Sequence, residues 1–376
     1  MENNLDLISE LEKKIKTVRT KSFDLSFNEL LDMYKNKELI IDPEYQRLFR
    51  WDFEQQSRFI ESLLLEMPIP PIFVVEREEG IYELIDGLQR ISTYMHFRGE
   101  HPDNTNDAPD QPDSKYLKLV GCDICKLLNG QTYLDLPKTL EIRLKRNFIR
   151  VEVLRKESDQ RLRYHMFKRL NTGGSKLSEQ EIRNCTIRLL SPTFNNFLIT
   201  CSQYPSFKKC ISSVSQEKID QKYDQELVLR FFSVKNRQDE YVHDVSSYLT
   251  NCMEFFSTDN NFDYNKEEYI FQQTFNLLNK TLGDKTFSPA TKKKKLASKF
   301  AIYHFEAISL SAAMHIEQLK ELNDKQLKIL KSILESIKLD DDFINMTTGG
   351  GKNYAGPLKD RINFAEKKVS DFCNGL

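Results

Sequence analysis

The stretch YELIDGLQR, residues 82–90, decides the fold of the N-terminal part of this chain. Its first residues, and Val74–Val75 before the Glu79–Gly80 pair, have the β-branched and aromatic character of a β-hairpin. Asp86-Gly87 interrupts this strand pattern, and apolar residues then recur at helical spacing as far as Phe97. The sequence therefore predicts a strand that turns directly into a helix.

The N-terminus of this predicted helix is a candidate anion site. A helix N-terminus presents unpaired N–H groups and a partial positive charge, which suit a phosphate. Gly87 lets the backbone approach closely, and Gln89 and Arg90 add side-chain donors in the first turn. A capped helix followed by a solvated arginine is the plainer alternative, and these residues alone do not exclude it.

Length and composition indicate a polar, water-soluble chain with room for two domains. The chain has 376 residues, of which 39% are hydrophobic and 30% charged, and its net charge is −1. The global charge therefore neither indicates nor excludes a nucleic-acid partner. No apolar run approaches the roughly 18 residues of a membrane span, and the start lacks the features of a signal peptide. We expect a cytoplasmic protein without a membrane partner.

The seven cysteines are an odd number scattered through a long chain, which does not indicate a disulfide framework. Cys122 and Cys125 form a C-x-x-C pair. A zinc site would need a second pair or nearby histidines at a recognisable spacing, and neither is present. We expect buried thiols here, with a redox motif as the alternative.

The pattern along the chain predicts a small α+β domain followed by an almost wholly helical region. Two helices are expected within residues 1–35, the second capped by Ser26, and a capping box is expected at Ser178 and Glu181. The other expected elements are a strand at 39–41, helices at 53–67 and 159–170, a strand at 147–154, and amphipathic helices at roughly 224–256, 266–282 and 295–337.

Two further motifs carry chemistry similar to that of the first. DPEYQRLFRW, residues 42–51, places an amide and a guanidinium before a helix, where Arg47 suits a bidentate phosphate contact and Trp51 is expected to pack. FKRLNTGGS, residues 167–175, ends a predicted helix at Asn171 and two glycines. A glycine C-cap explains that ending, and an anion site formed by Asn171 and the surrounding N–H groups is the alternative.

These three motifs, with PIPPIF at residues 68–73 between them, resemble the N-terminal family of GmrSD-type restriction systems, also known as domain-of-unknown-function family 262. The family pattern is I-P-x-Y-Q-R-x-[YF]-x-W, P-I-P, D-G-Q-Q-R and then F-x-x-[IL]-N-x-G-G-x-x-L-x-x-x-E, and the resemblance covers about residues 20–190. This chain departs from it at Leu88, which stands where the family has the first Gln of D-G-Q-Q-R.

The resemblance implies a ParB/sulfiredoxin-like nucleotide-binding domain at residues 20–160, followed by a helical domain at 161–376. It further implies a module that binds an NTP with Mg²⁺ and hydrolyses it, in a prokaryotic anti-phage or restriction-type defence system that couples foreign-DNA sensing to an effector. Because Leu88 removes one amide from the expected pocket, we expect hydrolysis to be weakened and nucleotide binding to be kept.

The expected site residues follow from the matching motifs. For nucleotide binding they are Tyr45, Gln46, Arg47, Gly87, Gln89, Arg90, Asn171, Gly173 and Gly174. The expected catalytic residues are Asp86, Gln89, Arg90 and Arg47. Asp86 is also the candidate to position a metal or a water, while the two arginines stabilise charge on the transferring phosphate.

A basic segment, residues 138–169, is the other candidate for a partner. Arg143, Lys145, Arg146 and Arg150 are predicted to follow a nucleic-acid backbone such as DNA, unless this segment is simply a solvated face. Lys352, after three glycines, is a further candidate anion contact, together with Arg361.

Relatives often carry an HNH nuclease domain, and the sequence indicates none in this C-terminal half. An HNH centre needs clustered His and Asn or Asp around a metal, whereas His304 and His315 lie eleven residues apart in one predicted helix without such neighbours. Cutting would then belong to a separately encoded nuclease or toxin. Two other functions remain open: a non-catalytic nucleotide- or nucleic-acid-binding regulator of that partner, and a ParB-like DNA-nicking enzyme.

Overall fold

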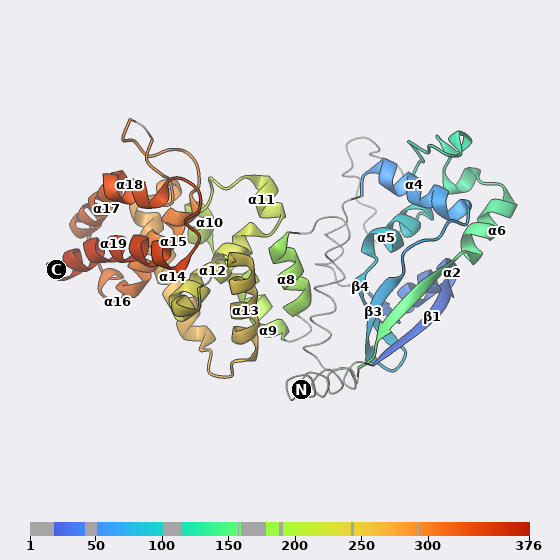
Figure 1. Cartoon of the computed structure of the whole chain (residues 1–376), viewed down its shortest axis with the longest axis horizontal. Coiled ribbons are helices and arrows are strands. Elements are labelled where there is room, and N and C mark those ends of the chain that lie inside the picture. Colours follow the sequence, from blue (N-terminus) through green and yellow to red (C-terminus); the bar gives the residue numbers. More distant parts are fainter. Residues whose placement is uncertain are drawn as a thin grey trace, which may run out of the picture. The chain divides into compact units, whose positions relative to one another are not determined.

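The computed structural model describes residues 19–41, 51–100, 115–156, 158, 178–187, 191–241, 244–291 and 293–376. Contacts divide the chain into two units, residues 1–177 and 178–376, which are considered separately below. The first unit combines a sheet with helices and the second is helical (Figure 1), so the predicted α+β class followed by a helical region is confirmed.

The sheet of the first unit has five strands in the order β1-β5-β3-β4-β2. They are β1 (Thr20–Ser26), β2 (Leu39–Ile40), β3 (Ile72–Glu78), β4 (Ile81–Asp86) and β5 (Phe148–Leu154). The β1–β5 and β3–β4 pairs are antiparallel, whereas β3–β5 and β2–β4 are parallel. The start of β3, the end of β4 and the start of β5 therefore lie at the same end of the sheet.

Within the described residues, four helices accompany this sheet: α2 (Phe27–Lys35), α4 (Phe53–Leu64), α5 (Leu88–Phe97) and α6 (Lys138–Arg146). Short 3-10 turns lie at Lys126–Leu128 and Tyr133–Asp135. The apolar faces of α2, α4 and α5 meet in the core, where the Phe27 ring lies 4.8 Å from that of Tyr94 and 6.3 Å from that of Phe59, centroid to centroid. Ser26 caps α2 as predicted, its side chain accepting from the N–H of Glu29 at 3.1 Å.

A buried carboxylate orders the loop that carries the C-x-x-C pair. Glu61 of α4 is 1% exposed and accepts from the N–H groups of Ile124 and Cys125 at 3.2 and 2.6 Å. Cys122 is buried, and burial raises the pKa of its thiol to about 11. Since the nucleophilic and metal-binding form is the thiolate, Cys122 behaves as a structural thiol.

The second unit contains twelve α-helices within the described residues. They are α8 (Glu179–Ile187), α9 (Pro192–Ser202), α10 (Pro205–Cys210), α11 (Gln216–Asp220), α12 (Tyr223–Arg237), α13 (Val245–Thr258), α14 (Tyr264–Thr281), α15 (Ile302–Met314), α16 (Ile316–Leu319), α17 (Asp324–Leu339), α18 (Asp341–Thr347) and α19 (Ala355–Cys373). The capping box at the start of α8 is confirmed, with Ser178 N–H donating to Glu181 at 2.7 Å. No described helix combines the length and apolarity that a membrane span requires.

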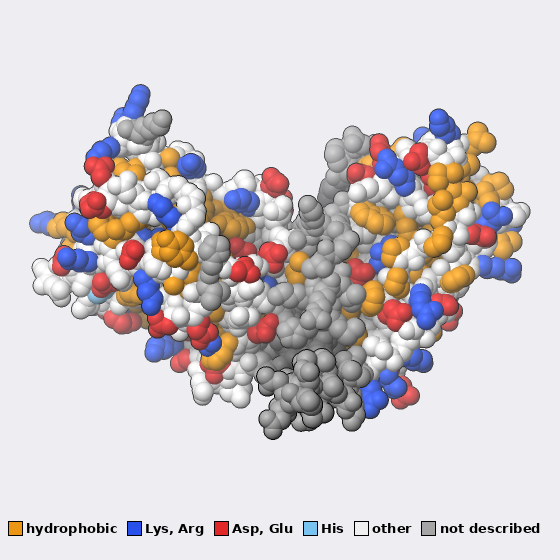
Figure 2. Space-filling model, in the orientation of Figure 1, with side chains coloured by type: hydrophobic (Ala, Val, Ile, Leu, Met, Phe, Trp, Pro, Cys, Tyr) orange, Lys and Arg blue, Asp and Glu red, His pale blue; other side chains and the backbone are white. Residues whose placement is uncertain are grey.

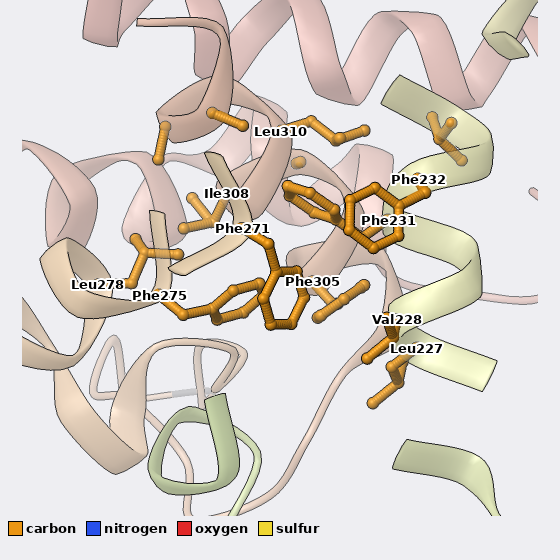
Figure 3. Close-up of a cluster of buried hydrophobic side chains, with 14 of the residues drawn as sticks. Leu227, Val228, Phe231, Phe232, Phe271, Phe275, Leu278, Phe305, Ile308 and Leu310 are labelled. Carbon is orange, nitrogen blue, oxygen red and sulfur yellow. The ribbon is translucent and has the colours of Figure 1, made fainter. Parts of the chain in front are cut away.

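Aromatic side chains dominate the core of this unit. Phe231 of α12, Phe271 and Phe275 of α14, and Phe305 of α15 turn toward one another (Figure 3), with 4.5 Å between the Phe271 and Phe275 centroids and 5.5 Å between those of Phe231 and Phe271. Every residue of α15 from His304 to Ala313 is buried. This helix is therefore central to the unit, which explains its apolar composition on all sides.

One predicted element is wrong, and one strand was not predicted. Residues 20–26 form strand β1, in which Leu25 faces the core and which pairs with β5 along its whole length. The helix predicted from residue 295 begins only at Ile302: residues 290 and 296 form an isolated antiparallel bridge, and Lys294 and Lys295 lie in the turn between them. The helix predicted at 159–170 lies outside the described residues.

His304 is a buried histidine that contributes to stability in a pH-dependent way. It is 1% exposed, neither ring nitrogen has a hydrogen-bond partner among the described residues, and its ring lies edge-on against Phe343 at 5.1 Å. Burial, with a smaller contribution from the nearby Lys338 ammonium, lowers the pKa of His304 to about 3. The ring is thus neutral in the folded protein and takes up a proton on unfolding at acidic pH.

Replacing His304 with Phe is expected to flatten the acid side of the stability profile. Because the folded pKa lies below the unfolded value of 6.5, this group's contribution is complete above pH 6.5 and is lost as the pH falls toward 3. The loss is about 1.4 kcal/mol per pH unit, or about 2 kcal/mol between pH 6.5 and 5. Urea unfolding at a series of pH values measures it. Phe343→Leu should lower stability yet keep the wild-type slope, and a His304→Phe profile parallel to the wild type would contradict the assignment.

Candidate functional site

The turn between β4 and α5 is the described part of the predicted nucleotide site. Strand β4 ends at Asp86 and helix α5 begins at Leu88, as the sequence predicts, with Gly87 between them at φ 110° and ψ 8°. The N-cap residue of α5 is Gly87, which has no side chain to cap the first turn. A Cβ built at Gly87 would lie 2.3 Å from Cγ2 of Ile72. The glycine is therefore required by its positive φ and by the close approach of β3, rather than by space left for an anion.

Arg90 joins this turn to the loop before β3. Its Nη2 donates to Asp86 Oδ2 at 2.7 Å and to the carbonyl oxygen of Pro71 at 3.1 Å. The side chains of Arg90 and Asp86 are only 15% and 28% exposed. The Nε of Arg90 is buried and has no acceptor among the described residues. One end of the guanidinium is thus fixed in place, while one of its donors lacks a partner.

Gln89 connects the same turn to the first motif. Its side-chain oxygen accepts from the backbone N–H of Trp51 at 3.0 Å. The carbonyl of Trp51 in turn accepts from Gln56 Nε2 at 2.9 Å, and Gln56 Oε1 lies 2.9 Å from Nδ1 of His96 on α5. The Trp51 ring packs against Phe59, with 5.5 Å between centroids, which confirms its predicted packing role. Gln89 therefore anchors the last residue of the DPEYQRLFRW motif to the start of α5.

Leu88, the position that departs from the family pattern, is buried in the core at 3% exposure. Residues two apart on a helix do not face each other, which agrees with the burial of Leu88 and the partial exposure of Arg90. In this chain the departure is a packing residue and leaves Asp86, Gln89 and Arg90 at the turn.

The remaining predicted nucleotide-binding residues lie outside the described residues. They are Tyr45, Gln46, Arg47, Asn171, Gly173 and Gly174. The structure thus brings together Asp86, Gly87, Gln89 and Arg90, with Trp51 as the described end of the first motif. The convergence of all three motifs on one pocket stays a prediction.

Asp86 is the candidate metal-positioning residue, and it is paired with Arg90. Among the described residues, no group of three or more His, Cys, Asp or Glu side chains has the arrangement of a metal site. Mg²⁺ is usually held by one or two carboxylates together with substrate phosphates and water, so a lone aspartate at a phosphate site fits this ion.

Three of the four predicted nucleic-acid contacts line one groove. Arg143, Arg146 and Arg150 border a groove of about 810 Å³ formed by α6, the start of β5 and the loop after α4, whereas Lys145 does not line it. The sequence did not predict the apolar side chains of this groove, because they come from two separate segments. They are Met67, Pro68, Ile69, Ile142 and Phe148.

The predicted anion contact at Arg361 is wrong. Arg361 is fully buried, and its Nε and Nη2 donate to Glu306 Oε2 at 2.9 and 2.5 Å. Its Nη1 donates to the carbonyl of Lys352 at 3.1 Å, which ties the loop after the three glycines to α19. A late arginine next to a glycine run resembles a phosphate contact in sequence, but here an acidic partner on α15 neutralises it.

Comparison with known proteins gives one match. Residues 27–188 match the family model described as GmrSD restriction endonuclease, N-terminal domain. This range includes four of the five strands, the β4–α5 turn and α8. No curated protein and no solved structure matches the chain.

Proposed function

We propose that residues 27–188, which match the family model of the GmrSD restriction endonuclease N-terminal domain, form a module of a restriction-type defence system. This module would bind a nucleoside triphosphate at the β4–α5 turn and hydrolyse it. The single observation that carries the proposal is the Asp86–Arg90 pair at the N-terminus of α5, where the N-cap residue is Gly87. The turn places a fixed cation, a carboxylate and a helix N-terminus within one short segment.

The residues of this turn suit a triphosphate with Mg²⁺. The positive end of α5 and the guanidinium of Arg90 favour a phosphate group, and the Nε of Arg90, which has no acceptor among the described residues, is a donor that a phosphate oxygen would satisfy. Asp86 would hold the Mg²⁺ that accompanies the phosphates, or orient the attacking water. Gln46 and Arg47 are proposed to contact the phosphates from the motif that ends at Trp51, with Asn171 and the Gly173–Gly174 pair closing the pocket. Hydrolysis would couple sensing of foreign DNA to an effector encoded separately.

A second function, nucleotide binding without turnover, is favoured by one observation. Arg90 and Gln89 already hold structural partners, namely Asp86, Pro71 and Trp51. A nucleotide that replaced these partners would change the loop before β3 and the end of the first motif. Such a rearrangement suits a regulator that restrains a nuclease or toxin, whether or not the nucleotide is hydrolysed.

Replacing Arg90 with Ala is expected to lower phosphate release from a nucleoside triphosphate at least about a hundredfold, as for the loss of one preorganised charged donor. The measurement is phosphate release by the full chain with ATP, GTP, CTP or UTP and Mg²⁺, with and without DNA. Arg77→Ala is the matched control, because Arg77 forms an ion pair with Glu83 on the same hairpin, away from the turn. Circular dichroism of both variants checks the fold.

The results of these measurements distinguish the hydrolase, the regulator and the ParB-like nicking enzyme. Turnover that Arg90→Ala abolishes and Arg77→Ala retains supports the hydrolase. Nucleotide binding by the wild type without turnover supports the regulator. Absence of binding to all four nucleotides contradicts both, and DNA nicking without nucleotide supports the ParB-like enzyme instead.

A further inference from the structure

The groove beside α6 combines exposed apolar side chains with arginines. Phe148 is 63% exposed and Ile142 is 40% exposed, and with Met67 they line the same groove of about 810 Å³. In the space-filling view, orange side chains gather over α4 and α6 with blue ones among them (Figure 2). Exposed apolar residues that cluster in this way mark interaction sites more often than isolated ones do.

The charge of the groove is positive. Arg143, Arg146 and Arg150 line it, against Glu66 as the one acidic residue among the described lining residues. The Nε of Arg143 lies 3.6 Å from Glu66, and both side chains are largely exposed, so this ion pair is weak. Arg146 is exposed and has no ion-pair partner among the described residues. An occupant that brings acidic groups therefore finds at least one unpaired guanidinium.

We propose that this groove binds an acidic segment of a partner protein that inserts one or two apolar side chains. The apolar side chains would pack between Phe148, Ile142 and Ile69, and neighbouring Asp or Glu residues of the partner would pair with Arg146 and Arg143. The groove volume lies within the roughly 300–1,000 Å³ of pockets that hold a small ligand, which is enough space for such side chains.

The lining favours a peptide over a nucleic acid. Bases stack on aromatic faces, and among the described lining residues Phe148 is the one aromatic side chain, whereas the other apolar ones are aliphatic. Asp24 and Glu152 lie 3.6 and 3.1 Å from Arg150, so carboxylates flank the basic residue that a phosphate backbone would follow. A short acidic segment needs one or two charge pairs, whereas a nucleic acid needs a continuous positive surface.

The groove also adjoins the candidate nucleotide site through one loop. Pro68 and Ile69 line the groove, and two residues later the carbonyl of Pro71 accepts from Arg90. A segment bound in the groove would thus lie against the loop that holds Arg90. Binding in the groove does not depend on the nucleotide proposal, and the experiment below omits nucleotide.

The test selects peptides from a random phage-displayed library on the full-length chain and measures the enriched peptides by fluorescence anisotropy. We expect enrichment of peptides with apolar residues among Asp and Glu, and at least tenfold weaker binding to Phe148→Ser and to Arg146→Ala. Leu127→Ser and Lys156→Ala are matched controls, since Leu127 is 87% exposed in the same unit and Lys156 follows the opposite end of β5. Both controls should bind as the wild type does.

Three outcomes would overturn the proposal: enrichment of peptides without acidic residues, enrichment of none, or equal binding by Phe148→Ser. Labelled single-stranded and duplex oligonucleotides form the parallel arm. An oligonucleotide that binds more weakly to both groove variants, and that no selected peptide displaces, would assign the groove to nucleic acid instead.

Discussion

Replacing Glu306 with Gln is expected to destabilise the helical unit by about 3–5 kcal/mol, the usual cost of removing one partner from a buried ion pair. Glu306 of α15 is 1% exposed and lies between two buried arginines. Arg230 Nη1 donates to its Oε1 at 2.6 Å, and Arg361 donates to its Oε2 through two nitrogens. Without this carboxylate, the cations of α12 and α19 both lose their main acceptor inside the core.

The ion-pair network continues beyond Glu306, so that one of the two arginines keeps an acidic partner after the substitution. Glu226 lies 3.8 Å from Arg230 and 2.6 Å from Arg183, so Arg230 keeps a weaker partner. Among the described residues, Arg361 keeps the carbonyl of Lys352 and the face of Tyr303, 4.5 Å from its guanidinium carbon. The loss should therefore fall mainly on the attachment of α19 to α15.

Urea unfolding followed by two signals measures this effect. The chain has a single tryptophan, Trp51 in the first unit, whereas far-ultraviolet circular dichroism reports mainly the helices of the second. Glu306→Gln should move the circular dichroism transition to lower urea and leave the tryptophan transition in place. Asp239→Asn is the control, because Asp239 pairs with Lys359 at a fully exposed position and should unfold as the wild type does.

A double variant tests whether the cost comes from leaving a buried arginine without its carboxylate. Glu306→Leu with Arg361→Met removes both partners of the closest pair, and such apolar replacements are often close to neutral. It should therefore be more stable than Glu306→Gln. A cost below about 1 kcal/mol for Glu306→Gln, or a double variant less stable than it, would contradict the assigned role of the pair.

The sequence predicted elements well where local signals agree. Helix α5 has its predicted bounds and β4 ends where expected, since Asp86-Gly87 and the apolar spacing act within a few residues. Strand β1 was missed because its stabilising partner, β5, lies more than a hundred residues away in the sequence. No local pattern reports a pairing of that kind.

The same difference between local and long-range signals decides which parts of the candidate sites could be predicted. The Asp86–Arg90 turn was predicted because all its residues are contiguous, and its ion pair is an i, i+4 contact across the helix start. Only the arginines of the groove were predicted, because they are close in sequence. Its apolar side chains were not, because Met67 and Ile69 reach Phe148 only through the packing of α4 and α6. The burial of Arg361 likewise could not be predicted from local sequence, because it depends on Glu306, fifty-five residues earlier.

Replacing Gly87 with Ala is expected to destabilise the first unit by about 3 kcal/mol or more. A non-glycine residue at this positive φ costs of order 1–3 kcal/mol. The new methyl group would also lie 2.3 Å from Cγ2 and 2.9 Å from Cβ of Ile72, so that β3 and α5 must separate, and overpacking of this kind adds typically 1–3 kcal/mol. The loss should appear as an earlier tryptophan transition, because Trp51 is bound to Gln89 in the next turn.

Gly130→Ala is the matched control for the cost of placing a non-glycine residue at positive φ. Gly130 has φ +88° in the same unit, and a Cβ there would meet no atom within 4 Å. The stability of this variant should fall only by the conformational cost of the positive φ, without the cost of a steric contact. Equal losses for Gly87→Ala and Gly130→Ala would show that the contact with Ile72 does not matter.

A double-mutant cycle with Ile72→Ala isolates the contact itself. Ile72→Ala leaves a cavity and is destabilising alone, but it removes the Cγ2 atom that the methyl group of Gly87→Ala would strike. The double variant should therefore be more stable than the sum of the two single losses predicts, by about 1 kcal/mol or more, as for residues in direct contact. Additive losses would mean that the turn adjusts without Ile72. In that case Gly87 would be required for its φ alone, and the close packing of β3 on α5 would not hold Asp86 and Arg90 in place.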